Sequence, residues 1–219
     1  MTMGNTSIFE KLHLGILALK LDLNDAQEKQ LCDFLSLLHK WNQAFNLSGI
    51  KEIKDMIPTH ILDSLSVLPH LKANKVLDVG TGAGLPGIPL AIANPETSFT
   101  LLDSNAKKTN FLHQCILELG IKNVKVKKTR VQDYECEILF DVAISRAYNT
   151  LAQMGQDIKK LLAADGRIFA MKGKYPKEEI EEAEKLFNII DIKKINVPQL
   201  NAQRHLIIMA PNNETGIYG

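Results

Sequence analysis

Residues 76–91 read VLDVGTGAGLPGIPLA, and the expected architecture follows from them. A short apolar run that contains Asp78 predicts a strand over 76–79, and glycines follow at 80, 82 and 84. Glycine lets backbone approach a ligand without a Cβ in the way, and it adopts positive φ at little cost. The helix that the residues after Gly84 predict would present its first, unpaired N–H groups to that ligand. The stretch therefore predicts a strand–loop–helix unit that holds a nucleotide-like ligand.

Strand and helix patterns alternate through the rest of the chain. Strands are predicted over 98–102 (ending at Asp103), 124–128, 140–145, 166–171, 189–197 and 205–209, and helices over 85–94, 107–119, 151–163 and 178–187. This alternation is typical of an α/β fold with a mostly parallel sheet and helices on both faces. Ligands of such sheets bind outside the carboxyl ends of the strands. We therefore expect the functional residues directly after strands one, two, four and five.

The first third of the chain carries only helical patterns. Helices are predicted over 8–20, from an N-cap at Asn24 to about residue 46, and from Pro58 to Pro69. We therefore expect a helical extension over 1–74 and an α/β ligand-binding domain over 75–219.

Composition is ordinary for a globular protein, with 45% hydrophobic and 23% charged residues and a net charge of +1. The three cysteines show no metal-binding or disulfide spacing, which fits a reducing cytosol. No apolar run is long enough to span a bilayer, and the N-terminus lacks a signal-peptide pattern. We expect a cytoplasmic protein with no metal and no membrane partner.

Asp103 follows the second predicted strand, about 20 residues after the glycines, where an acid that binds ribose is expected. A carboxylate accepts two hydroxyl donors at once. The alternative is that Asp103 caps the helix starting near Lys107. With the glycines in front of it, ribose binding is the favoured interpretation.

The identity of the ligand depends on Asp78. The run from Gly82 to Gly87 matches the dinucleotide pattern G-x-G-x-x-G, which by itself is a weak signal. A carboxylate at Asp78 would repel a pyrophosphate but suits a ligand with an ammonium and a sulfonium. The acid and the three glycines also resemble the signature of class I methyltransferases. S-adenosyl-L-methionine is therefore favoured over NAD, and over a tight turn without a ligand.

The methyl acceptor is indicated by the residues after strand four. Cytosine C5 methylation needs a cysteine nucleophile, and neither Cys115 nor Cys136 is well placed. Guanine N7 has a free lone pair, so positioning and electrostatics suffice. Arg146 would hydrogen-bond guanine O6 or a phosphate. The alternative, that Arg146 pairs with Asp141 or another nearby acid, stays open.

Basic residues are concentrated between Ser104 and Arg130, where seven stand against one acid, Glu118. They are Lys107, Lys108, Lys122, Lys125, Lys127, Lys128 and Arg130. A phosphate backbone would be attracted to such a stretch, although solvated surface lysines are the simpler alternative. Lys172, directly after strand five, and Arg204, at the start of the last strand, are the expected RNA contacts.

Together these motifs resemble the bacterial small-subunit (16S) ribosomal RNA guanine-N7 methyltransferases, also called the glucose-inhibited division protein B family. The resemblance runs from about Trp41 to Met209. The matching motifs are Trp41-Asn42, Asn46-Leu47, residues 60–64, 80–87 and 101–104, Arg130-Val131-Gln132, residues 144–147, Lys172-Gly173 and residues 204–206.

The resemblance implies a class I methyltransferase domain, Rossmann-like, with a seven-stranded sheet whose last strand is antiparallel. It implies S-adenosylmethionine as donor and a guanine of small-subunit RNA as acceptor. Donor-binding positions match Asp78, Gly80, Gly82, Gly84, Leu85, Asp103, Val131, Gln132 and Arg146, and catalytic or RNA-facing positions match Arg146, Lys172 and Arg204. Ala83 and Gln132 depart from the family, which commonly has proline and glutamate there.

Several points stay open at this level. The chain alternatively methylates a small molecule or a protein, or is a non-catalytic dinucleotide- or RNA-binding module. His60 and Asp63, polar residues in an apolar helical pattern, are expected to serve packing or capping. A monomer is expected, and the RNA substrate is either naked or part of an assembled or partly assembled subunit.

Overall fold

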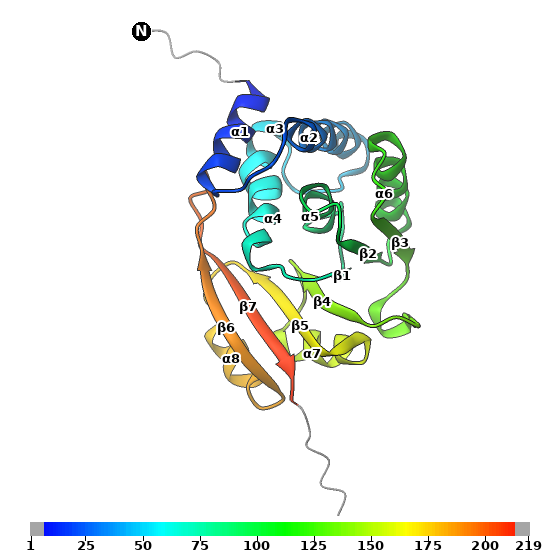
Figure 1. Ribbon diagram of the computed structural model, residues 1–219, viewed down its shortest axis with the longest axis vertical. Helices are drawn as coiled ribbons and strands as arrows, with labels where there is room; N and C mark the ends of the chain where they lie inside the picture. The colour runs from blue at the N-terminus through cyan, green and yellow to red at the C-terminus, as the bar shows by residue number, and fades with distance from the viewer. Residues whose placement is uncertain (1–6, 213–219) are drawn as a thin grey trace, which may run out of the picture.

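The computed structural model describes residues 7–212, and within them seven strands form one sheet (Figure 1). Its order is β3-β2-β1-β4-β5-β7-β6, and β7 is antiparallel to both of its neighbours while the other pairs are parallel. The strands are β1 (Lys75–Val79), β2 (Ser98–Asp103), β3 (Val124–Lys128), β4 (Phe140–Ser145), β5 (Leu162–Lys172), β6 (Phe187–Ile195) and β7 (Arg204–Pro211). The predicted α/β fold with an antiparallel last strand is confirmed.

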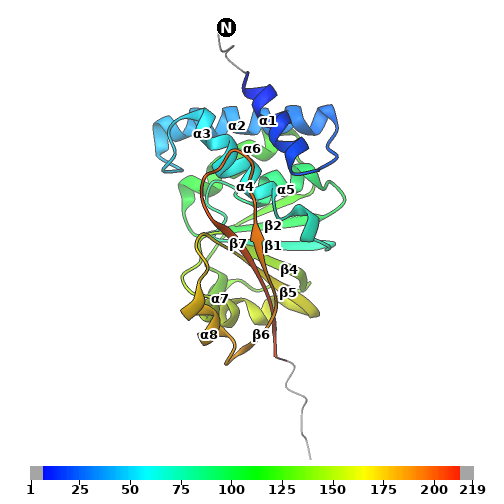
Figure 2. The ribbon, with the colours of Figure 1, turned by 90° about the vertical axis from the view of Figure 1, so that its left-hand side faces the viewer.

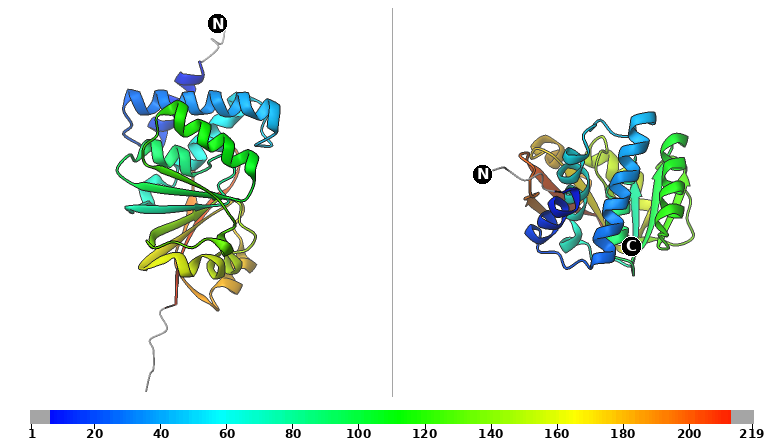
Figure 3. Two further views of the ribbon diagram at one scale, coloured as in Figure 1. Left: turned by 90° about the vertical axis from the view of Figure 1, so that its right-hand side faces the viewer. Right: turned by 90° about the horizontal axis from the view of Figure 1, so that it is seen from above.

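Helices cover both faces of the sheet because successive strand residues point to opposite sides. In β1, Val76 packs into one apolar cluster and Leu77 into the other. The helices α1 (Ile8–Ala18), α2 (Asp25–Phe45), α5 (Gly87–Ala93) and α6 (Ala106–Leu119) lie on the first face, and α7 (Leu151–Ile158) and α8 (Lys177–Ala183) on the second (Figures 1 and 3).

The helical extension shares its core with the sheet. Its helix α2 begins at the predicted cap, where Asn24 and Gln27 form a reciprocal capping box. Phe34 and Trp41 of α2 lie against Phe111 of α6, with ring centroids 6.4 and 5.5 Å apart. The buried cluster therefore runs without a break from α1 to the sheet.

This shared core predicts that extension and sheet unfold together. Replacing the fully buried Leu35 of α2 by alanine should lower the free energy of unfolding by about 2–5 kcal/mol. The matched change at Leu117, which is 78% exposed on α6, should alter it by less than about 0.5 kcal/mol. Urea unfolding followed by Trp41, the single tryptophan, should coincide with the loss of circular dichroism. Two separate transitions would contradict a shared core.

Several predicted boundaries are wrong. The helix expected over 178–187 ends at Ala183 as α8, and the strand expected over 189–197 runs over Phe187–Ile195 as β6. Two further differences have identifiable physical reasons. The third helical segment starts at Ile53, not at Pro58, and runs through α3 (Ile53–Met56), η1 (Ile57–Leu62) and α4 (Asp63–Leu65) before the turn η2 (Leu68–His70). η1 is a π-helical turn, which accommodates Pro58, a residue without an N–H, inside the segment.

The second difference lies before β5. The helix predicted over 151–163 ends with α7 and the 3-10 turn η4 (Lys159–Leu161), and β5 begins at Leu162, four residues before the predicted strand. Leu162 pairs with Phe140 of β4, and a register shift follows. Strand pairing therefore overrides the local helical pattern of Ala163 and Ala164.

The connection between β6 and β7 reaches the N-terminal helices (Figure 2). There Gln199 Nε2 donates to the carbonyl oxygen of Lys11 in α1, at 2.8 Å. In the described range 7–212, no helix combines the length and the apolar character needed to cross a membrane.

Candidate functional site

The loop after β1 wraps around the buried carboxylate of Asp78. Its Oδ2 accepts hydrogen bonds from Thr81 Oγ1 at 2.7 Å and from the Gly87 amide at 2.8 Å. The other oxygen, Oδ1, is buried and has no partner among residues 7–212. Gly80 has a φ of 67° and would meet nothing within 4 Å if it carried a Cβ. One carboxylate oxygen thus holds the loop, and the other makes no hydrogen bond within residues 7–212.

Burial raises the pKa of Asp78 to about 6. The hydrogen bonds from Thr81 and Gly87 and the charge of Arg146 oppose this rise, and the charge of Asp103 adds to it. Because ionisation of a fully buried carboxyl is costly, a cationic ligand beside Oδ1 would favour the charged form.

Asp103, at the end of β2, fixes the glycine-rich loop. Its Oδ2 accepts from the Gly82 amide at 2.9 Å and its Oδ1 from the Asn105 amide at 2.8 Å. Helix α6 is capped by Asn105, whose side chain accepts from the Lys107 amide. The alternative that Asp103 caps this helix is therefore wrong. Each carboxylate oxygen retains a lone pair for a hydroxyl donor.

Val131 and Gln132 lie on the 3-10 turn η3 (Val131–Asp133) that follows β3. Val131 is buried, whereas Gln132 is exposed and donates to Asp157 Oδ2 of α7 at 2.8 Å. Tyr148, after β4, donates to the same oxygen. Gln132 is thus oriented by an acid on a neighbouring helix, at the edge of the sheet where β2 and β3 end.

Three predicted cations meet in one cavity of about 390 Å³. Arg146 follows β4, Lys172 ends β5, and Arg204 begins the antiparallel β7, so topology brings all three to the same edge of the sheet. We refer to the cavity that these three side chains line as the three-cation cavity. Thr59, His60 and Asp63 of the helical extension complete its wall.

Asp63 holds two of these cations. Its Oδ1 accepts from Arg204 Nε at 2.8 Å, and its Oδ2 lies 3.5 Å from Arg146 Nη1. Arg146 Nη1 also donates to the Thr59 carbonyl at 2.9 Å. Arg146 therefore pairs with an acid of the extension. Asp141, the candidate named from the sequence, instead accepts from the amides of Asn74 and Lys75.

The charges of this cluster offset only part of the cost of burial. Burial raises the pKa of Asp63, and the guanidinium groups of Arg204 and Arg146 oppose the rise. Lys172 is held separately, because its Nζ lies 2.8 Å from Glu179 Oε2, which also accepts from the Leu151 amide. Three cations and Asp63 line the cavity, and Glu179 pairs with Lys172 from outside the lining, so the region has a small net positive charge.

His60 and Asp63 were expected to serve packing or capping, but neither side chain caps a helix. His60 is 4% exposed, and its Nε2 lies 2.6 Å from Ser48 Oγ. Its Nδ1 is buried without a partner among residues 7–212. Burial first, and the charge of Arg146 second, lower the pKa of His60 to about 4, so the ring is neutral near pH 7.

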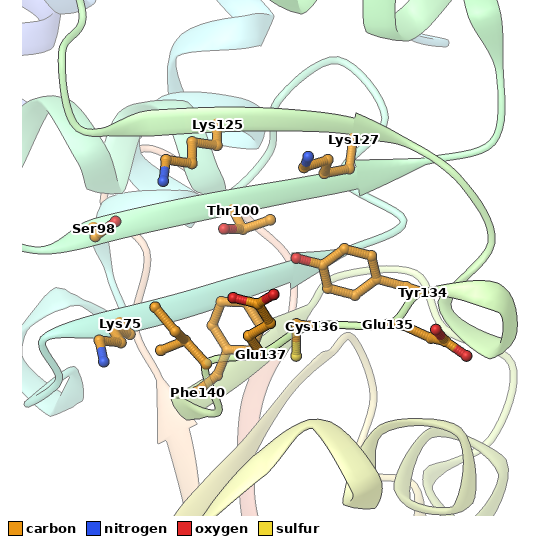
Figure 4. A pocket seen from close by; sticks show the side chains of 11 residues that line it. Lys75, Ser98, Thr100, Lys125, Lys127, Tyr134, Glu135, Cys136, Glu137 and Phe140 are labelled. Atoms are coloured by element: carbon orange, nitrogen blue, oxygen red, sulfur yellow. The ribbon is translucent and has the colours of Figure 1, made fainter.

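The lysine-rich stretch does not converge on this edge as a whole. Lys125 and Lys127 point from β3 over an uncovered part of the sheet, into a groove of about 460 Å³ (Figure 4). Lys75 also lines this sheet-face groove, and Glu135 and Glu137 line it as well. The strong positive charge predicted for the stretch is therefore partly balanced.

Residues 27–207 match the family model described as rRNA small subunit methyltransferase G. Proteins named ribosomal RNA small subunit methyltransferase G are similar to the chain over most of its length. The one from Nitrosococcus oceani is 47% identical, covering 91% of this chain and 94% of that protein. The one from Hahella chejuensis is 44% identical, covering 94% and 95%.

Among solved structures, a SAM-dependent methyltransferase from Thiobacillus denitrificans, crystallised with S-adenosyl-L-homocysteine, aligns with a TM-score of 0.54. It is 12% identical and covers 68% of this chain and 90% of that one. At this identity the likeness shows a common fold.

Proposed function

Because the chain belongs to the rRNA small subunit methyltransferase G family, we propose that it transfers a methyl group from S-adenosyl-L-methionine to N7 of a guanine in small-subunit (16S) ribosomal RNA. The chain is a ribosomal RNA methyltransferase. The observation that carries the finer proposal is a loop with a free buried carboxylate oxygen at the same edge of the sheet as the three-cation cavity.

The residues around the loop fit the proposed donor. S-adenosylmethionine carries an ammonium and a sulfonium, and the sulfonium supplies the methyl group. Asp78 Oδ1, which has no partner among the described residues, suits the ammonium, and the remaining lone pairs of Asp103 suit the ribose hydroxyls. We propose as donor-binding residues Asp78, Gly80, Gly82, Gly84, Leu85, Asp103, Val131, Gln132 and Arg146.

The three-cation cavity fits the proposed acceptor. Guanine N7 uses its own lone pair, so the protein supplies no base and acts by orientation. We propose Arg146 and Lys172 as catalytic residues that orient the guanine, and Lys172 and Arg204 as RNA contacts. Guanine gains a positive charge when N7 is methylated. Asp63 and Glu179, which pair with the cations, limit repulsion of that charge.

Radiolabel transfer tests the proposal directly. Small-subunit RNA, naked and as purified subunits, is incubated with the protein and methyl-labelled donor. We expect label in the RNA and strand scission at one guanine after borohydride and aniline treatment, which detects N7-methylguanine. Label in a small metabolite or a protein instead of RNA, or on another atom, would refute the assignment.

We propose that the protein acts in the cytoplasm as a monomer, on small-subunit RNA that is either naked or part of an assembled or partly assembled subunit, and without a metal ion. Residues 1–74 are proposed to be an extension and residues 75–219 the S-adenosylmethionine-binding methyltransferase domain. The shared apolar cluster supports an extension that is a structural part of the domain.

Donor binding is predicted to depend on pH through Asp78. Its pKa of about 6 in the free protein should fall when an ammonium binds, so binding releases a proton below pH 6. Calorimetry should show affinity rising by up to about tenfold per pH unit toward pH 6 and levelling above it. Asp78→Asn should weaken binding and flatten this profile, and the exposed-pair variant Asp33→Asn should keep it. A wild-type profile that is flat from pH 5 to 8 would contradict this role.

A further inference from the structure

A second groove opens beside the three-cation cavity and shares Gly173 and Arg204 with it. It encloses about 820 Å³ between the segment after β5 and the connection from β6 to β7. We call it the flanking groove. Its polar lining residues are Lys174, Lys194, Asn196, Asn201, Gln203 and Arg204.

The charged residues that line the flanking groove are all positive. Its lining includes Lys174, Lys194 and Arg204, and none of the described lining residues is acidic. Neither lysine forms an ion pair with another residue of the range 7–212. In the sheet-face groove, by contrast, Glu135 and Glu137 accompany the lysines. The flanking groove is therefore the better match for an extended polyanion.

Contacts from three directions fix the walls of the flanking groove. His205 Nδ1 lies 2.8 Å from the Gly173 carbonyl, and Arg204 is bound to Asp63. Gln199 ties the β6–β7 connection to α1. A groove held in this way loses little conformational entropy when a ligand binds.

An exposed aromatic ring stands next to Lys174. Tyr175 is 49% exposed and packs edge-on against His205, with ring centroids 5.7 Å apart. Its outer surface is free to stack on a base, and aromatic rings beside cations are how proteins bind single-stranded nucleic acid.

The proposed reaction also requires a non-helical RNA segment. Guanine N7 lies on the major-groove edge, which is deep and narrow in A-form RNA and closed to side chains. We propose that the flanking groove binds the single-stranded RNA adjoining the target guanine, with phosphates at Lys174 and Lys194 and a base against Tyr175. This inference rests on the proposed function.

Two double variants with the same change in net charge test it. In Lys174→Glu/Lys194→Glu we expect KM for small-subunit RNA to rise at least tenfold, with kcat and donor affinity unchanged. The plot of log affinity against log salt should become less steep by about 1.4, since each phosphate contact contributes about 0.7 in single strands. For Lys75→Glu/Lys125→Glu, in the sheet-face groove, KM for small-subunit RNA should stay within about twofold of wild type.

The role of the aromatic ring is tested separately. Tyr175→Ala should raise KM for small-subunit RNA several-fold, and Tyr175→Phe should not.

RNA binding is measured by filter binding in parallel with methyl transfer. The two readouts distinguish failure of this inference from failure of the proposed function. If the wild type transfers methyl to RNA and both double variants match it, or both lose affinity equally, the flanking groove is not the binding surface. If RNA binds through the groove but receives no methyl group, the inference stands and the proposed function fails. If RNA neither binds nor receives methyl, both fail.

Discussion

Replacing Asp63 by asparagine is expected to lower kcat for methyl transfer by about a hundredfold while leaving donor affinity within a few-fold of wild type. Asp63 is 2% exposed and holds Arg204 and Arg146 with its two oxygens. The asparagine keeps the shape but leaves two guanidinium groups without a counter-charge. Misplacement of oriented groups by about 1 Å is enough for losses of this size.

The stability of this variant should fall as well. Removing one partner of a buried ion pair costs about 3–5 kcal/mol, because the remaining charge stays buried without compensation. Urea unfolding measures this loss, and assays are run at a temperature where the variant is folded. The exposed pair of Lys29 and Asp33 provides the control, since Asp33→Asn should change stability by less than about 1 kcal/mol.

A positioning role differs from a purely structural one in its kinetic signature. If Asp63 positions the cations, kcat falls in folded protein, the donor dissociation constant is nearly constant, and Asp63→Glu restores part of the rate. A folded Asp63→Asn protein with wild-type kcat and KM would remove Asp63 from the reaction and leave it a role in stability alone.

Replacing Arg146 by alanine is expected to lower kcat/KM by about a hundredfold to a thousandfold, the range found when an oriented hydrogen-bond donor is removed from an active site. Arg146 pairs with Asp63, and its charge favours the ionised forms of the buried carboxyls of both Asp63 and Asp78. Its loss should therefore also raise the pH at which Asp78 ionises and move the donor-binding profile to higher pH. Calorimetry against pH measures that shift.

The same variant decides which ligand Arg146 contacts. A large rise in the donor dissociation constant with unchanged KM for RNA assigns Arg146 to the donor, and the opposite result assigns it to the guanine. Lys172→Ala is the matched comparison, because Lys172 pairs with Glu179 and not with Asp63 or Asp78. Wild-type turnover by Arg146→Ala would refute a catalytic role for Arg146.

Local patterns were sufficient for much of the fold and for the loop that surrounds Asp78. Short β-branched or aromatic runs between helical patterns indicate all seven strands, and the N-cap pattern at Asn24 indicates the start of α2. Asp103 could be predicted because a single strand–helix–strand unit sets its position relative to the glycines. In the structure its Oδ2 accepts a hydrogen bond from the Gly82 amide. Features of this kind depend on residues close together in the chain.

The acid at the centre of the three-cation cavity could not be found in this way. Asp63 and Arg204 are 141 residues apart, and their contact depends on docking of the extension against the last strand. His60 and Ser48 are closer in sequence than Asp63 and Arg204 are. Their contact still depends on how the helical segment and the loop pack together, because packing decides which side chains point toward each other. The available signal was the presence of a charged residue in an apolar helical pattern. That signal fits a buried ion pair as well as a cap.

The place of β7 in the sheet bears on how the protein is made. β7 is the last strand in the chain, yet it lies between β5 and β6 and carries the arginine that Asp63 binds. During synthesis from the N-terminus, the helical extension and the first six strands leave the ribosome before β7 does. Until then β6 has no partner strand, one edge of β5 is unpaired, and Asp63 lacks Arg204. The nascent enzyme thus stays incompetent until its final strand emerges, and truncation before residue 204 should leave a chain without a working site.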